Sequence, residues 1–190
     1  MYENLDNSEL LRASIDAMGR EQSGEAMSLL KILVEREPEN FHGHYLLAAE
    51  HMQLGMVDRA EEGFRRAVAL APDFPLARFQ LGQLYLVKGD AVAAKSTLGP
   101  LLDLPPGSAL PCYAQGLIAA ADEDGAGAIE ALRAGLACEQ DSLPLASDMQ
   151  RLLAQLLATQ GDGALPVEVG MGAAVNAAPL YLSAYGKADP

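Results

Sequence analysis

Three histidines lie close together in the sequence, and histidine is the side chain that most readily binds metals or transfers protons near neutral pH. They are His42, His44 and His51. On a helix, His44 and His51 would stand two turns apart, about 10.5 Å, so one ion could not bridge them directly. Both also fall at positions where helices would pack together, so we expect satisfied core histidines. We therefore predict no metal site.

The other candidate motifs also point away from catalysis. The acidic run Asp122-Glu123-Asp124 lacks the alternating ligands and the distant glutamate of a calcium loop, so we expect an acidic corner between two helices. The segment Gly170-Met171-Gly172 lacks the third glycine of a dinucleotide-binding fingerprint. Cys112 and Cys138 have no metal-ligand spacing. Because a nucleophile elbow, a P-loop and a zincin motif are also lacking, we predict a protein that is not an enzyme and uses no cofactor.

Composition and charge narrow the class of protein and its partners. Half of the 190 residues are hydrophobic, only 5% are aromatic and tryptophan is absent, which favours helices rich in alanine and leucine. A net charge of -13 repels phosphate backbones, so we expect no nucleic acid partner. No apolar run approaches the roughly 18 residues of a membrane span. The first residues lack the positive charge and apolar stretch of a signal peptide, so we expect a cytoplasmic protein.

Residues of the same kind recur every 34 positions, which indicates a repeat protein. Glycines Gly55 and Gly89 lie between apolar-periodic segments of about a dozen residues, where a turn between two helices favours glycine. Each repeat is therefore predicted to be a helical hairpin that stacks on its neighbours. The recurring positions are the prolines Pro38, Pro72 and Pro106, the alanines Ala26, Ala60, Ala94 and Ala128, the bulky residues Leu30, Phe64, Leu98 and Leu132, and the small residues Ser14, Ala48, Gly82 and Gly116.

This pattern resembles the tetratricopeptide repeat, and the resemblance covers residues 7–140. The second and third repeats fit it best, and the fourth has Gln140 where a proline is expected. The resemblance implies an all-α fold, a right-handed superhelical solenoid of antiparallel helix pairs with about four repeats. We expect a C-terminal capping helix after them and a non-helical tail, which divides the chain into residues 1–160 and 161–190. The capping helix is predicted from Leu145, Met149, Leu152, Leu153 and Leu156.

One proline interrupts the third repeat. Gly99-Pro100 falls inside its second helix, where proline removes a hydrogen-bond donor and clashes with the preceding turn. We therefore expect this helix to end or kink near Leu98 and residues 101–106 to be irregular.

The first helix of each repeat carries a second apolar stripe, about a quarter turn from the packing stripe. In proteins similar to this one, that stripe lines the concave groove where peptides bind. Members that clamp a chaperone's acidic C-terminus place Lys, Arg and Asn there, whereas this stripe is apolar and favours an apolar peptide or helix oriented by Gln83 and His42. The alternative is that part of the stripe packs against neighbouring helices. The predicted groove residues are His42, Tyr45, Met52, Leu76, Phe79, Gln83, Leu86, Leu110, Tyr113 and Leu117.

The C-terminal segment, residues 161–190, breaks the helical pattern. Its alternating apolar residues Leu165, Val167, Val169 and Met171 are typical of an extended strand. We interpret the segment as an occupant of the groove, in its own chain or in a second copy; the alternative is packing outside the capping helix. The predicted function is a non-catalytic adaptor or chaperone-like module that binds another protein, and the alternative is a homo-oligomeric assembly scaffold joined through the tail.

Overall fold

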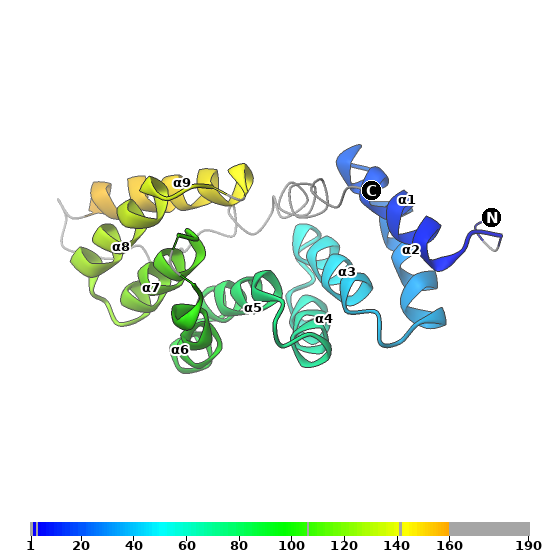
Figure 1. Ribbon diagram of the computed structural model, residues 1–190, viewed down its shortest axis with the longest axis horizontal. Helices are drawn as coiled ribbons and strands as arrows, with labels where there is room; N and C mark the ends of the chain where they lie inside the picture. Colours follow the sequence, from blue (N-terminus) through cyan, green and yellow to red (C-terminus); the bar gives the residue numbers. More distant parts are fainter. Residues whose placement is uncertain (1, 3, 106, 141, 160–190) are drawn as a thin grey trace. The chain divides into compact units, whose positions relative to one another are not determined.

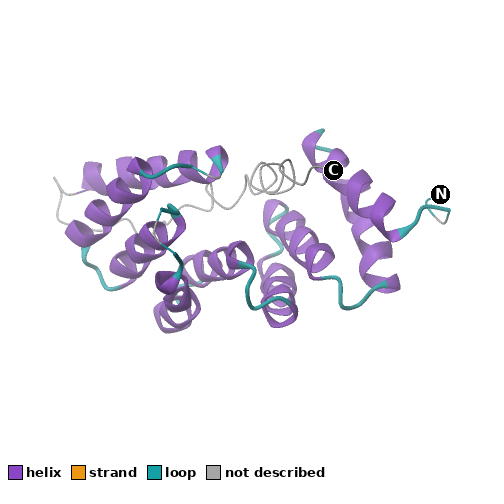
Figure 2. Cartoon of the chain, viewed as in Figure 1, coloured by secondary structure: helices purple, strands orange, loops and turns teal. Residues whose placement is uncertain are grey.

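The computed structural model describes residues 2, 4–105, 107–140 and 142–159, and every regular element in these residues is helical (Figures 1 and 2). The prediction of an all-α fold is confirmed. The predicted tail, residues 161–190, lies outside the described residues. The described chain divides into two compact units, with the boundary inside α5, after Ala77. The elements are α1 Asn7–Gly19, α2 Ser23–Arg36, α3 Phe41–Gln53, α4 Val57–Leu70, α5 Pro75–Val87, α6 Ala91–Leu98, the 3-10 helix η1 Gly99–Asp103, α7 Leu110–Ala121, α8 Gly125–Ala137 and α9 Leu143–Thr159.

The first compact unit contains two helix pairs, α1 with α2 and α3 with α4, and α2 also packs against α3. The side chain of Asp6 accepts a hydrogen bond from the Glu9 amide at 2.8 Å and Glu9 bonds back to the Asp6 amide at 2.9 Å, which fixes the start of α1. The side chain of Asn40 caps α3 with a single hydrogen bond, which it accepts from the amide of Gly43 at 2.8 Å. Gly55, at the turn between α3 and α4, has a φ of +71°, the conformation that favours glycine.

The second compact unit shows how the recurring small and bulky residues meet. A Cβ atom built on Gly82 of α5 would lie 2.5 Å from Cγ of Leu98 in α6. One built on Gly116 of α7 would lie 2.9 Å from Cγ of Leu132 in α8. Both contacts are closer than carbon atoms tolerate, so the glycines permit the close approach of the paired helices. The small and bulky residues therefore recur every 34 positions because they pack against each other in these helix pairs.

The third repeat departs from a regular hairpin at its proline. Helix α6 ends at Leu98, as predicted, after only eight residues. The chain then continues as the 3-10 helix η1, with Pro100 in its first turn, and Leu101 is buried. The prediction that residues 101–106 are irregular is thus wrong for residues 101–103, which belong to η1. The physical reason is that a proline at the start of a helical turn removes no hydrogen bond.

The fourth repeat ends with a glutamine in place of the proline. The side-chain amide of Gln140 donates to the carbonyls of Gly135 and Cys138 at 2.8 and 2.7 Å, and its oxygen accepts from the Tyr113 hydroxyl at 2.7 Å. These bonds fasten the end of α8 to α7. Helix α9 then packs against α8. Its buried face contains Leu145, Met149, Leu152 and Leu156, and Leu153 is half-buried, as expected of the predicted capping helix.

The Gly82 contact generates a stability prediction. Gly82→Ala adds a methyl group against Leu98, which is fully buried and has little room to move. We expect a net loss of about 1–3 kcal/mol, because overpacking outweighs the gain of roughly 1 kcal/mol in helix propensity. Urea denaturation followed by circular dichroism measures the change. The control is Gly24→Ala, in α2, where the new methyl would contact nothing within 4 Å and unfolding should become slightly harder. Equal effects of the two substitutions would contradict the packing argument.

Candidate functional site

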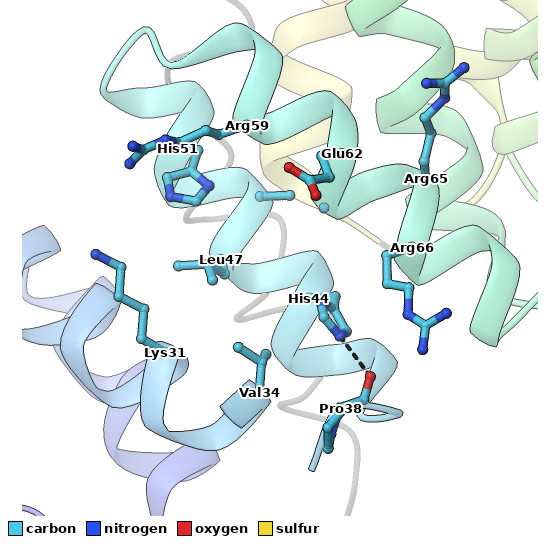
Figure 3. Close-up of a pocket in the computed structure, with 12 residues that line it drawn as sticks. Lys31, Val34, Pro38, His44, Leu47, His51, Arg59, Glu62, Arg65 and Arg66 are labelled. Carbon is cyan, nitrogen blue, oxygen red and sulfur yellow. Dashed lines mark hydrogen bonds between the residues drawn. The ribbon is translucent and has the colours of Figure 1, made fainter. Parts of the chain in front are cut away.

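Helix α3 presents two different faces, because successive residues on a helix are turned by about 100°. One face carries His42, Tyr45 and Met52 from the predicted groove stripe. The other, centred roughly a third of a turn away, carries His44, Leu47, Ala48 and His51. The second face borders a cleft between α2, α3 and α4 with a volume of about 750 Å³, large enough for a ligand of several residues (Figure 3).

The cleft has an apolar floor. Val34 comes from α2, and Leu47 and Ala48 come from α3. Helices α3 and α4 approach closely here, because a Cβ atom on Gly63 would lie only 2.8 Å from that of Ala48. Gly63 itself lines the cleft. The lack of a side chain at this position therefore permits the close approach of α4 to α3 at the floor of the cleft.

The rim of the cleft is cationic. It carries Lys31 from α2 and three arginines from α4, Arg59, Arg65 and Arg66, against a single lining carboxylate, Glu62. Four of the 13 lysines and arginines of the chain thus gather at one site, although the net charge is -13. Arg65 is paired with Glu61 on the same helix at 3.2 Å. The local charge is therefore opposite in sign to that of the whole protein.

The two histidines of the cleft correct our expectation of satisfied core residues. His44 is half-buried, and its Nε2 lies 2.9 Å from the carbonyl oxygen of Pro38. His51 is only 8% exposed, yet its Nδ1 has no hydrogen-bond partner among the described residues. Burial lowers the pKa of His51, and the positive charges of Arg59 and Lys31 lower it further. Glu62 acts in the opposite direction. His51 is consequently a neutral, unsatisfied side chain in the wall of a cationic cleft.

Next to His51 on α3 lies a buried carboxyl group. Glu50 is 1% exposed, and within the described residues neither of its side-chain oxygens has a hydrogen-bond partner at normal distance. Burial raises the pKa of Glu50, because the charged form loses its hydration, and the nearby Ser23 hydroxyl offsets this only in part. The neutral form of Glu50 is therefore favoured by folding.

The predicted groove residues fall into two groups by exposure. That they line a binding groove stays a prediction, but six of the ten have almost no exposed surface, because their side chains pack within the chain. Tyr45 illustrates this, with its ring 5.8 Å from that of Phe64 and 4.9 Å from that of Phe74. The buried six are Tyr45, Met52, Phe79, Leu110, Tyr113 and Leu117. The half-buried four are His42 and Leu76, in the first compact unit, and Gln83 and Leu86, in the second.

His42 belongs to an aromatic cluster that the groove prediction did not include. Its ring lies 3.7 Å from that of Phe41 and 5.9 Å from that of Phe74, and the two phenylalanines are 5.3 Å apart in an edge arrangement. All three side chains are half-buried. Burial lowers the pKa of His42, so the cluster is uncharged at neutral pH. Phe41 and Phe74 were missed because neither recurs with the period of 34 residues.

The comparisons with known proteins agree with this architecture. Residues 41–84, which include α3 and α4, match the family described as "Tetratricopeptide repeat". The chain is 30% identical over 96 residues to the "Tetratricopeptide repeat and J domain-containing co-chaperone DNJ1" of Fusarium oxysporum f. sp. lycopersici. That match covers 50% of this chain but only 18% of the co-chaperone.

Solved structures show the same fold. The tetratricopeptide repeat protein TTC0263 of Thermus thermophilus has a TM-score of 0.67 and 24% identity, covering 82% of this chain and 84% of that one. MamA, residues 41 to the end, from Desulfovibrio magneticus RS-1 has a TM-score of 0.61 and 23% identity, covering 83% and 88%. The fold is therefore that of an all-α helical-repeat protein. Residues 41–84 match the tetratricopeptide repeat, and the helix pairs around them are similar to those of solved tetratricopeptide repeat proteins.

The buried carboxyl group generates a pH-dependent prediction. A raised pKa in the folded state means that stability is lost as pH rises from the ordinary value of 4.5 through the folded value. Glu50→Gln removes this loss, so we expect the variant to melt at a higher temperature than the parent at pH 7, with the difference shrinking toward pH 4. Thermal melts across this range measure the effect. Glu130→Gln, at an exposed position on α8, should show no such pH-dependent gain. A pH-independent difference at Glu50 would contradict the assignment.

Proposed function

We propose that this protein is a non-catalytic interaction module, an adaptor or chaperone-like protein that binds an apolar segment of a client along the first helices of its repeats. Tetratricopeptide repeats are protein-interaction modules, and the match to that family lies on α3 and α4. The observation that carries the finer proposal is the half-exposed aromatic cluster of Phe41, His42 and Phe74 on this same repeat. Aromatic side chains that are partly buried and held by neighbours are the usual anchors of protein interfaces.

The contact surface in this proposal consists of groups that the fold leaves open to a partner. In the first compact unit these are the aromatic cluster and Leu76, which follows Phe74 by two residues and is also half-buried. The rigid rings lose little conformational entropy when a client binds. Most of the free energy gained by burying apolar surface therefore contributes to affinity. The neutral state of His42 adds no charge that an apolar client would have to desolvate. These properties favour an apolar segment as the ligand.

None of the described helices combines the length and the apolar character of a membrane span. The assembly alternative, in which the tail fills a groove, concerns residues 161–190 and stays a prediction.

A photo-crosslinking experiment tests the proposed client surface. A benzophenone amino acid replaces Leu76 in the full chain, which is expressed in its native cell, irradiated and purified. We expect discrete crosslinked partner proteins, because the client would lie against this position. The matched control is the same replacement at Val92 of α6, an apolar residue that is 77% exposed but lies outside the predicted groove. Equal yields of the same adducts at both positions would refute the proposal. Adducts of twice the chain's own mass would favour the assembly alternative.

A further inference from the structure

The cationic cleft between α2, α3 and α4 contains charged side chains that take no part in the proposed binding of an apolar client. Among the described residues, Lys31, Arg59 and Arg66 form no ion pair, and Arg59 donates a hydrogen bond to the sulfur of Met56 at 4.0 Å. Like charges gathered on one rim repel each other, which favours a ligand that neutralises them. The uncompensated cations thus indicate an anionic ligand.

The arrangement of these charges indicates the shape of the ligand. Figure 3 shows Lys31 and Arg59 on one side of Leu47 and Arg66 on the other. Arg59 and Arg66 are seven residues apart on α4, which corresponds to about 10.5 Å along the helix axis. A phosphate or another small anion needs donors that converge on one point, whereas here the cations are spread along an apolar floor. A chain in the polyproline II conformation covers about 9 Å in three residues and brings the side chains of residues i and i+3 to the same side.

We propose that this cleft binds an acidic segment of a partner protein in the polyproline II conformation, with two carboxylates three residues apart and an apolar side chain between them. One carboxylate lies between Lys31 and Arg59, and the other pairs with Arg66. The intervening apolar side chain rests on Leu47 and Val34. The volume of about 750 Å³ accommodates a segment of this size.

His51 provides an independent indication of a ligand at the Arg59 end. Its ring is more than nine-tenths buried, lines the cleft and leaves Nδ1 without a partner among the described residues. An unmade hydrogen bond at a buried polar atom is costly, and a ligand can supply the missing partner. Nδ1 itself is buried, so a rotation of the ring is needed to bring its N–H group to a carboxylate between Lys31 and Arg59, which then accepts the hydrogen bond. The carboxylate also offsets the positive charges that hold the pKa of His51 down.

The net charge of the protein does not oppose this ligand at close range. Charges farther away than about 8 Å are largely screened at physiological salt, so the cations of the rim decide the local field. A long polyanion such as nucleic acid would extend beyond the cleft over acidic surface and be repelled. A short acidic peptide segment would not. The site also differs from the aromatic cluster in both position and ligand chemistry, so the inference stands apart from the apolar client surface.

Fluorescence anisotropy with synthetic peptides tests the proposal on the full chain. The probe is a fluorescein-labelled, end-blocked peptide, Gly-Ser-Glu-Ile-Val-Glu-Ser-Gly, and the control peptide has glutamine in place of both glutamates. We expect saturable binding of the first peptide only. Arg59→Glu and Arg66→Glu should each weaken it about fivefold or more, because each removes an ion pair and adds a repulsion. Arg12→Glu makes the same charge change on α1, outside the cleft, and should leave affinity unchanged. Circular dichroism melts establish that the variants are folded.

A second readout follows His51 by NMR during a pH titration of its ring resonances. We expect the pKa of His51 to rise when the glutamate peptide is bound and to stay unchanged with the glutamine peptide. Absence of a saturable rise in the anisotropy of the labelled peptide at protein concentrations up to about 1 mM would overturn the proposal. So would equal weakening by Arg12→Glu, or displacement of the peptide by an equal concentration of inorganic phosphate. The first two would indicate no specific site, and the third a general anion site. None of these outcomes bears on crosslinking at Leu76.

Discussion

The contact between a small residue on the first helix of a pair and a bulky residue on the second sets how closely the two helices can approach. Gly82 meets Leu98 in this way, and Gly116 meets Leu132. Because a Cβ atom at either glycine would overlap the partner leucine, each contact fixes both the separation and the rotation of its helices. The direction of the other side chains on those helices follows from it. The surfaces of these two repeats therefore depend on a contact that is itself buried.

Most of the fold could be predicted from the sequence because its signals are local or strictly periodic. The period of 34 residues locates the pairs, Gly55 locates a turn, and Pro100 ends α6 after Leu98. The continuation as η1 was not predicted, because the rule that proline breaks a helix says nothing about a new helical turn that begins with it. At position 140, the presence of glutamine where the repeat pattern expects proline indicated only that the fourth repeat departs from the pattern. The hydrogen bonds of the Gln140 side chain to α7 and α8 depend on tertiary contacts.

The candidate site was harder to predict, because helical periodicity identifies an apolar face but not what covers it. Tyr45 is covered by Phe64 and Phe74, residues 19 and 29 positions away. The cleft was missed for a related reason. His44 and His51 were assigned to the packing stripe, as the repeat pattern suggested, but they border open space. A signal was present in the sequence: five of the 13 lysines and arginines fall between positions 31 and 66, and four of these five line the cleft, on the second helices of two repeats. Only the packing of α2 and α4 around α3 brings them to one site.

The positive character of the cleft depends on the buried neighbours of its wall as well as on its rim. Burial raises the pKa of Glu50 and lowers that of His51, so both adjacent residues are shifted toward their neutral forms. Glu50 does not line the cleft, and its burial disfavours a negative charge that would oppose Lys31 and Arg59. Among the lining residues, Glu62 alone carries a charge of the opposite sign, so the exposed cations set the sign of the local charge on this acidic protein.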